Sequence, residues 1–327
     1  MRHARLAWTM LRYRVASLLL PFFLMAPAFH GQLREFRWQY LAGVLALGGS
    51  YVVAKCLNDV FDLDVDRINH PGAPDRPLVS GAATPRQLIT VSVVAAAVAL
   101  IAGTSVGSGG AALVAASLVL NIAYSAPPIR LCARPLAAPI VLGFAYVVLP
   151  YGIGLAASGL PPSQLDARVA ACFVVLFMGR MLLKDFRDRQ GDAAFGKRTF
   201  LLAYGKSPTL AVTLGCIVVG DALLVTVAPP NPWLILVLES YFAGIAFQLY
   251  RLWVADESLA ERLAIALGAR MGNAVVLTLL GFLLLDASGA PAAEQAVFVV
   301  AVGGMFWFAF AYLTLRQREG ALAGYRG

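Results

Sequence analysis

The sequence predicts an all-α polytopic membrane bundle of nine or ten transmembrane helices. Hydrophobic residues make up 60% of the 327-residue chain and charged residues only 13%, whereas a soluble domain is about half apolar and about a quarter charged. The mean hydropathy is +0.75. The apolar residues also form blocks of about twenty, the length at which a helix crosses the hydrocarbon core of a bilayer.

Ten apolar segments follow one another along the chain, separated by short stretches rich in Gly, Pro or charge. The breaks include "GSGG", "SAPP", "SGLPPS" and "APPNP", all typical of turns. No soluble domain interrupts the series, so we expect residues 1–327 to form a single transmembrane domain, with residues 291–316 as a possible extra span. The expected segments are 15–31, 39–57, 87–106, 109–125, 135–157, 166–184, 209–228, 232–250, 271–286 and 292–313.

The distribution of basic residues predicts an orientation. If the N-terminus is cytoplasmic, ten spans place nearly all Lys and Arg on the cytoplasmic side, with Arg34, Arg37 and Arg168 as exceptions. The net charge of +8 therefore fits a lipid bilayer as partner, and we expect no nucleic acid. An Ala-rich, Lys-poor composition favours a bacterial plasma membrane.

Two acidic clusters lie where apolar segments end on that side. The first is "NDVFDLDVD" at residues 58–66, and the second lies in "RMLLKDFRDRQGD". Spacings of three and four residues place the members of each cluster on one helix face, with Asp64 pointing away from it. The first stripe is Asn58, Asp59, Asp62 and Asp66, and the second is Asp185, Asp188 and Asp192.

Two carboxylate stripes that face each other in a partly dry pocket require a cation between them. Hard oxygen ligands suit Mg²⁺, which is often bound by a few carboxylates together with phosphate oxygens of a substrate. The pattern therefore predicts a magnesium site for a phosphorylated substrate, most simply a diphosphate. Basic residues that could hold the remaining diphosphate oxygens are Lys184, Arg12, Arg67, Arg76 and Arg130.

The same residues resemble a known family, the UbiA-type intramembrane prenyltransferases. "NDVFDLDVD" fits its N-D-x-x-D-x-x-x-D motif, and "RINHPGAPDRPLVSG" resembles the usual continuation. "YSAPPIRL" at 124–131 looks like the third signature, and "KDFRDRQGDAAFGKRTF" resembles the second acidic motif with its Gly-Lys-x-Thr stretch. The resemblance covers nearly the whole chain.

The resemblance implies a ring of transmembrane helices around a central cavity, with the acidic motifs facing each other at its cytoplasmic mouth. It implies two Mg²⁺ ions held by Asn58, Asp62, Asp66, Asp185, Asp188 and Asp192. It assigns catalytic roles to Asp62, Asp66, Asp188, Asp192, Lys184 and Tyr124. Substrate binding is expected from Asn58, Asp59, Arg12, Arg67, Arg76 and Arg130. The chain departs from the family in having ten expected spans instead of nine, and in lacking a Lys after Arg130.

The expected activity is transfer of an isoprenyl group from an isoprenyl diphosphate to a small acceptor, with an aromatic ring as the commonest acceptor in the family. Two alternatives stay open. A membrane terpene cyclase would ionise the same donor and close the ring with the donor's own double bond. A polytopic transporter would use buried acids to move ions, although the acids here lie at one mouth and no inverted repeat is evident.

Overall fold

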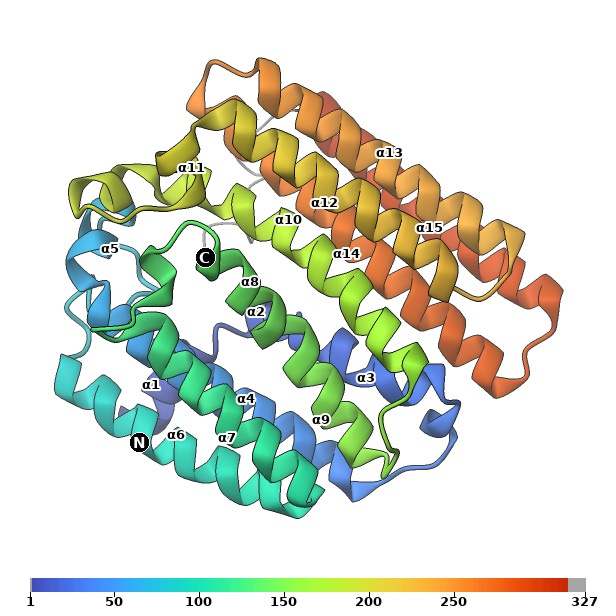
Figure 1. Ribbon diagram of the computed structural model, residues 1–327, viewed down its shortest axis with the longest axis horizontal. Helices are drawn as coiled ribbons and strands as arrows, with labels where there is room; N and C mark the ends of the chain where they lie inside the picture. The colour runs from blue at the N-terminus through green and yellow to red at the C-terminus, as the bar shows by residue number, and fades with distance from the viewer. Residues whose placement is uncertain (1, 317–327) are drawn as a thin grey trace.

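The computed structural model describes residues 2–316, and all regular structure in this part of the chain is helical. Long helices run side by side through the molecule, and two short helices, α5 and α11, lie together at one end (Figure 1). The predicted fold class, an all-α membrane bundle, is confirmed.

Helix boundaries in the first half follow the predicted segments closely from α4 onward. These helices are α1 (Arg2–Leu11), α2 (Tyr13–Ala16), α3 (Leu19–Phe29), α4 (Trp38–Phe61), α5 (Leu63–Asn69), α6 (Pro85–Val106) and α7 (Ser108–Ser125). The second half contains α8 (Ala137–Gly143), the π-helical turn η3 (Phe144–Val148), α9 (Leu149–Ala157), α10 (Gln164–Ala194), α11 (Phe200–Tyr204), α12 (Lys206–Val227), α13 (Pro232–Val254), α14 (Ser258–Ser288) and α15 (Ala292–Arg316). Short 3-10 turns, η1 (Gln32–Arg34) and η2 (Leu131–Ala133), complete the order.

Eight helices among the described residues are long and apolar enough to cross a membrane, counting α8, η3 and α9 as one. The chain is therefore an integral membrane protein. The expectation of a continuous first span over 15–31 is wrong, because the chain turns at Ser17 and Leu18 and α3 has only eleven residues. The predicted sixth segment lies in the 31-residue α10, which carries charged residues along its length.

Specific residues stop and restart the helices. A capping box in which Thr84 and Gln87 satisfy each other's backbone N–H groups begins α6, and Ser163 with Asp166 begins α10 in the same way. Gly107 and Gly205, with φ of 121° and 83°, lie in a region that L side chains rarely adopt. They let α6 turn directly into α7 and α11 into α12.

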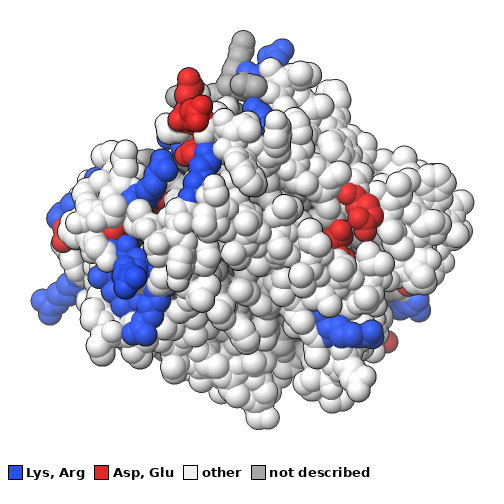
Figure 2. Space-filling view, turned by 45° about the horizontal axis from the view of Figure 1, so that its top comes forward, with Lys and Arg blue, Asp and Glu red and all other residues white. Residues whose placement is uncertain are grey.

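The helices pack as two groups joined through the middle of the bundle. Helix α4 packs on α6 and α7, while α10 packs on α12, and α13 on α14 and α15. Helices α3 and α9 join the two groups, and they touch closely at Gly154, where a Cβ atom would collide with the carbonyl oxygen of Phe23. On the face that Figure 2 shows, Lys and Arg gather mainly at the end that carries α5 and α11, and much of the rest of that face is uncharged.

Candidate active site

The two acidic motifs meet in one cavity of about 490 Å³ at the end of the bundle that carries α5 and α11. The first motif comes from the end of α4 and from α5, and the second from the last turns of α10. Ten predicted site residues line this cavity, which we call the chamber: Arg12, Asn58, Asp62, Asp66, Arg76, Tyr124, Lys184, Asp185, Asp188 and Asp192.

Asp62 occupies the joint between α4 and α5 and is almost fully buried. Its carboxylate accepts hydrogen bonds from Asn58 Nδ2 at 3.0 Å, from Arg130 Nη2 at 2.8 Å and from Lys197 Nζ at 2.8 Å. Burial alone would raise the pKa of Asp62, but Lys197 and Arg130 outweigh it and hold the pKa below its usual value. Asp62 is therefore ionised at neutral pH.

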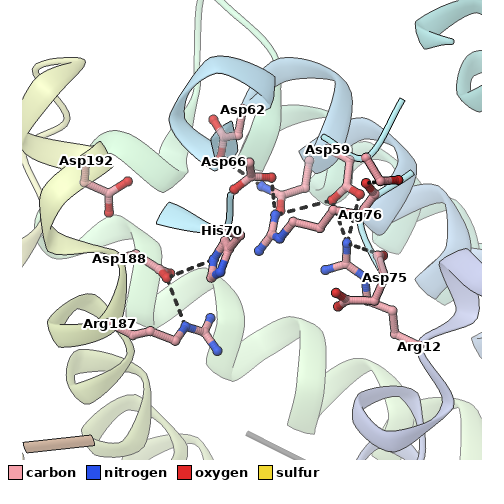
Figure 3. A network of polar contacts seen from close by, with 12 residues as sticks. Arg12, Asp59, Asp62, Asp66, His70, Asp75, Arg76, Arg187, Asp188 and Asp192 are labelled. Atoms are coloured by element: carbon pink, nitrogen blue, oxygen red, sulfur yellow. Dashed lines mark hydrogen bonds and ion pairs between the residues drawn. The ribbon is translucent and has the colours of Figure 1, made fainter. Parts of the chain in front are cut away.

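Across the chamber, Asp188 of α10 lies among the side-chain nitrogens of three residues. Arg187 Nε donates to it at 3.0 Å, Lys184 Nζ lies 3.5 Å away, and His70 Nε2 lies 3.4 Å away (Figure 3). Although burial raises the pKa of a carboxyl group, these neighbours lower the pKa of Asp188 well below its ordinary value. Figure 3 shows Asp188 and Asp192 on one wall, facing Asp62 and Asp66 on the other.

Lys197 connects the two motifs directly. Its ammonium nitrogen lies 2.8 Å from Asp62 Oδ2 and 3.3 Å from Asp192 Oδ1, and its side chain is only 8% exposed. Burial would lower the pKa of Lys197, but the carboxylates of Asp62 and Asp192 raise it above its usual value. One cation therefore reaches a carboxylate from each motif.

Gly191 allows the two motifs to approach each other. It lies in α10 between Asp188 and Asp192, and a Cβ atom there would meet the backbone oxygen of Val65 at 2.6 Å. The backbone N–H of Gly191 donates to Asn69 Oδ1 at 2.7 Å. Helices α5 and α10 thus touch through backbone at the position where the motifs face each other.

A second network anchors the basic side of the chamber. The buried Asp59 accepts from Arg12 Nη2 at 2.9 Å and lies 3.7 Å from Arg76 Nη1, and Arg76 also pairs with Asp66 (Figure 3). Burial raises the pKa of Asp66 to about 6 against the opposing effect of Arg76. In the second motif, burial raises the pKa of Asp185 to about 6 despite the nearby charge of Lys184.

Three predicted substrate-binding residues lie elsewhere than expected. Arg67 is exposed, pairs with Asp64 at 2.8 Å and does not line the chamber, because it is turned about 100° around α5 from Asp66; its role in substrate binding stays a prediction. Asp59 is enclosed behind the chamber wall and contacts Arg12 and Arg76, which line the chamber. Arg130 stands at the edge, where it contacts Asp62 without lining the chamber.

Sequence reasoning did not single out several polar residues of the site. They are Lys197, which bridges the motifs, Asn69 and His70 of the first loop, Arg187, and Lys55 in the chamber wall. Spacing carried a signal for His70, which follows Asp66 by one helical turn. Helical spacing gave no signal for Lys197, because it follows the end of α10. Its only signal was its place in the Gly-Lys-x-Thr stretch after the second acidic motif.

The residues of the chamber fit Mg²⁺ by their chemistry. In the described part of the chain, no group of three or more His, Cys, Asp or Glu side chains is already arranged as a metal site. The carboxylates are instead paired with Lys, Arg and His, as Lys197 shows. Because one cation already contacts both motifs, divalent cations could be held by the same oxygen ligands.

Beyond the charged residues, the chamber is lined by aromatic rings. Tyr146 stacks on Phe177 with ring centroids 5.1 Å apart, and Tyr51 meets Tyr146 edge to face at 6.4 Å. Tyr124 also lines the chamber. These rings offer π faces to a cation in a region where apolar side chains limit water.

Known proteins share sequence and fold with this chain. The model of the UbiA prenyltransferase family matches residues 18–268. The chain is 29% identical over 192 residues to the bacteriochlorophyll synthase 33 kDa chain of Rhodobacter capsulatus, a match covering 57% of this chain but only 60% of that protein. It is 32% identical over 251 residues to the digeranylgeranylglyceryl phosphate synthase of Methanothrix thermoacetophila, covering 74% of this chain and 85% of the relative.

Among solved structures, a UbiA homologue from Archaeoglobus fulgidus bound to geranyl diphosphate (GPP) and Mg²⁺ has a similar fold. The TM-score is 0.61 at 16% identity, and the match covers 91% of this chain and 99% of that one. At this identity the comparison supports the fold alone.

Proposed function

The chain belongs to the UbiA prenyltransferase family, and from this premise we propose that it transfers an isoprenyl group from an isoprenyl diphosphate to a small acceptor within the membrane, with Mg²⁺ as cofactor. The observation that carries the proposal is the contact of Lys197 with Asp62 and Asp192. It brings acidic motifs from two distant helices within reach of one cation, in a chamber with an aromatic interior.

The diphosphate of the donor binds at the acidic end of the chamber. Arg12, Arg76, Lys184 and Lys197 line that end and supply charge-assisted hydrogen bonds to phosphate oxygens. The residues that would hold Mg²⁺ are Asn58, Asp62, Asp66, Asp185, Asp188 and Asp192. When bound, Mg²⁺ neutralises the negative charge that develops on the departing diphosphate.

Departure of the diphosphate leaves an allylic cation on the isoprenyl group, and the apolar interior of the chamber controls what this cation reacts with. Tyr124, Tyr146 and Phe177 line the chamber and stabilise positive charge through their ring faces. The surrounding apolar helices exclude water, which would otherwise capture the cation. The acceptor attacks the cation and completes the transfer, and an aromatic ring is one acceptor chemistry that fits this route.

The proposal extends to the placement of the protein. The whole chain forms one catalytic membrane domain, with α15 as an additional span packed on α13 and α14. The end of the bundle that carries α5 and α11 faces the cytoplasm of a bacterial cell, because Lys and Arg gather there on the face that Figure 2 shows.

The test is product analysis with purified protein in lipid nanodiscs. Dimethylallyl, geranyl, farnesyl and geranylgeranyl diphosphates are offered with Mg²⁺, each with a phenol, an isoprenylglyceryl phosphate or a porphyrin carboxylic acid. Mass spectrometry of prenylated products and an assay for released diphosphate report the reaction. A cyclic hydrocarbon formed without acceptor would show that the protein is a cyclase instead of a transferase. If no donor releases diphosphate in the presence of Mg²⁺, both activities are refuted.

A further inference from the structure

A second cavity of about 360 Å³ lies beside the chamber, among α3, α10, α12, α13 and α14. Its walls are mainly apolar, with Phe22, Phe173 and Leu249 among them. Arg180 of α10 and Asn273 of α14 line both cavities. These two polar residues therefore stand at the junction between a charged space and an apolar one.

Arg180 comes before the aspartates of α10, five residues ahead of Asp185. It precedes Asp188 by two helical turns, roughly 12 Å along the axis of α10, and helical side chains tilt further toward the N-terminal end. Arg180 Nη1 donates to Asn273 Oδ1 at 2.6 Å, and no carboxylate in residues 2–316 forms an ion pair with it. A guanidinium without a counter-charge inside a membrane is costly and indicates a functional role.

Gln248 of α13 provides an independent observation in the second cavity. It is only 2% exposed and lines this cavity. Its carbonyl oxygen accepts from Arg251 at 3.4 Å, but its amide nitrogen has no hydrogen-bond partner in the described structure. A buried donor left without a partner destabilises the fold, so an oxygen atom of a ligand is the expected partner.

We propose that the second cavity is the acceptor subsite of the prenyl transfer, and that the acceptor is an anionic amphiphile. Its carboxylate or phosphate pairs with Arg180 at the junction, and its apolar body fills the second cavity, where an oxygen accepts from Gln248. This inference rests on the proposed function. The volume is within the range of ordinary ligand pockets.

The geometry also places the reacting atom of the acceptor. The anionic group is the part of the acceptor nearest the aspartates, so the nucleophilic atom belongs to that group or lies next to it. In the transfer, the C1–O bond of the donor breaks and its electron pair leaves with the diphosphate. The nucleophilic atom of the acceptor forms the new bond to C1, and a hydroxyl or ring C–H acceptor releases its proton to a diphosphate oxygen.

The test measures thermal unfolding in an uncharged detergent, without Mg²⁺ and without a prenyl diphosphate. Decyl phosphate, decanoate and decanol serve as probes of equal chain length. We expect decyl phosphate, decanoate or both to raise the unfolding midpoint of the wild type by several degrees, and decanol to raise it much less. A response to one anion assigns the headgroup chemistry, and a response to both indicates recognition of charge.

Variants locate the effect. Arg180→Gln should weaken the apparent affinity for the anionic probe at least 10-fold, Arg180→Lys should retain part of it, and Gln248→Leu should weaken it less. Arg168→Gln is the matched control, because Arg168 lies on the exposed surface of the same helix and lines neither cavity. It should behave as the wild type does.

Three results would overturn the proposal: an equal response to decanol, an unchanged response in Arg180→Gln, or an equal Arg180-dependent response to inorganic diphosphate, which would assign Arg180 to the donor. If Arg180→Gln does not fold, two measurements still test the proposal. They are the comparison of the anionic probes with decanol in the wild type and the response of Gln248→Leu. Release of diphosphate from geranyl diphosphate with Mg²⁺ is measured separately. A clear anion response without such release would retain the anion site and refute the transfer.

Discussion

Replacing Gly191 by alanine should separate the two acidic motifs while leaving the helix intact. A Cβ atom at this position would meet the backbone oxygen of Val65 at 2.6 Å and the side chain of Asn69 at 2.7 Å, whereas ordinary contacts begin near 3.4 Å. Because one of the obstacles is backbone, α5 and α10 must move apart by about 0.8 Å. The hydrogen bond from Gly191 to Asn69 lengthens with them.

The expected loss is larger in catalysis than in stability. Alanine improves the helix by about 1 kcal/mol, while overpacking destabilises by roughly 1–3 kcal/mol, so the free energy of unfolding changes little. A displacement near 1 Å in a catalytic constellation can lower the rate by about 10²-fold. We therefore expect kcat to fall by roughly 10- to 100-fold, with a higher concentration of Mg²⁺ needed for half-maximal rate.

The assay is the initial rate of diphosphate release at several Mg²⁺ concentrations, together with thermal unfolding. Gly215→Ala is the control, since Gly215 is an exposed residue of α12 with no atom within 4 Å of the new Cβ. A Gly191→Ala protein that unfolds as the wild type does and turns over at the wild-type rate would refute the claim that this contact sets the spacing of the motifs.

Three further outcomes follow from the chamber. Asp62→Asn should lower the rate of diphosphate release by at least about 10²-fold, and an unchanged rate would exclude Asp62 from the chemistry. Burial raises the pKa of Asp66 and Asp185 to about 6, so protons compete with Mg²⁺ for these carboxylates below that pH. A titration should therefore show that the apparent Mg²⁺ affinity falls from pH 7 to pH 5. An affinity that does not change with pH would contradict this. Lys197→Met should reduce the rate strongly and Arg67→Met very little, since only Lys197 reaches the acidic motifs, and equal effects in a steady-state assay would argue against the assignment.

Helical periodicity predicted most of the acidic site. Spacings of three and four residues placed Asn58, Asp62 and Asp66 together, and the structure brings them to one chamber although the helix ends at Phe61 and restarts at Leu63. The three side chains still share one face because only a single residue, Asp62, separates α4 from α5. Asp64, expected to point away, is exposed and paired with Arg67.

Contacts between distant segments could not be predicted in the same way. Whether a basic residue near a motif enters the chamber depends on the helix face it occupies, and its position in the sequence does not fix that face, as the exposed Arg67 shows. Lys197 reaches Asp62 across 135 residues of sequence, and Arg180 meets Asn273 across 93. Periodicity describes one helix at a time, so it gave no information on these pairs.

The prediction of one unbroken first span failed for a related reason. Hydropathy measures how apolar a stretch is, and residues 15–31 are apolar throughout, yet the backbone turns at Ser17 and Leu18. The short α3 then packs on α9 through a contact that requires Gly154. Packing against a neighbouring helix decided where this segment is helical.

The position of Lys197 has a consequence for how such a protein is made. A newly inserted chain has to close two rows of carboxylates on each other, and the lysine supplies the compensating charge from within the same polypeptide. Assembly of the bundle can then be completed before any inorganic ion arrives. If the site takes up Mg²⁺ as proposed, loading would exchange one cation for another, and the facing carboxylates would keep a counter-charge throughout.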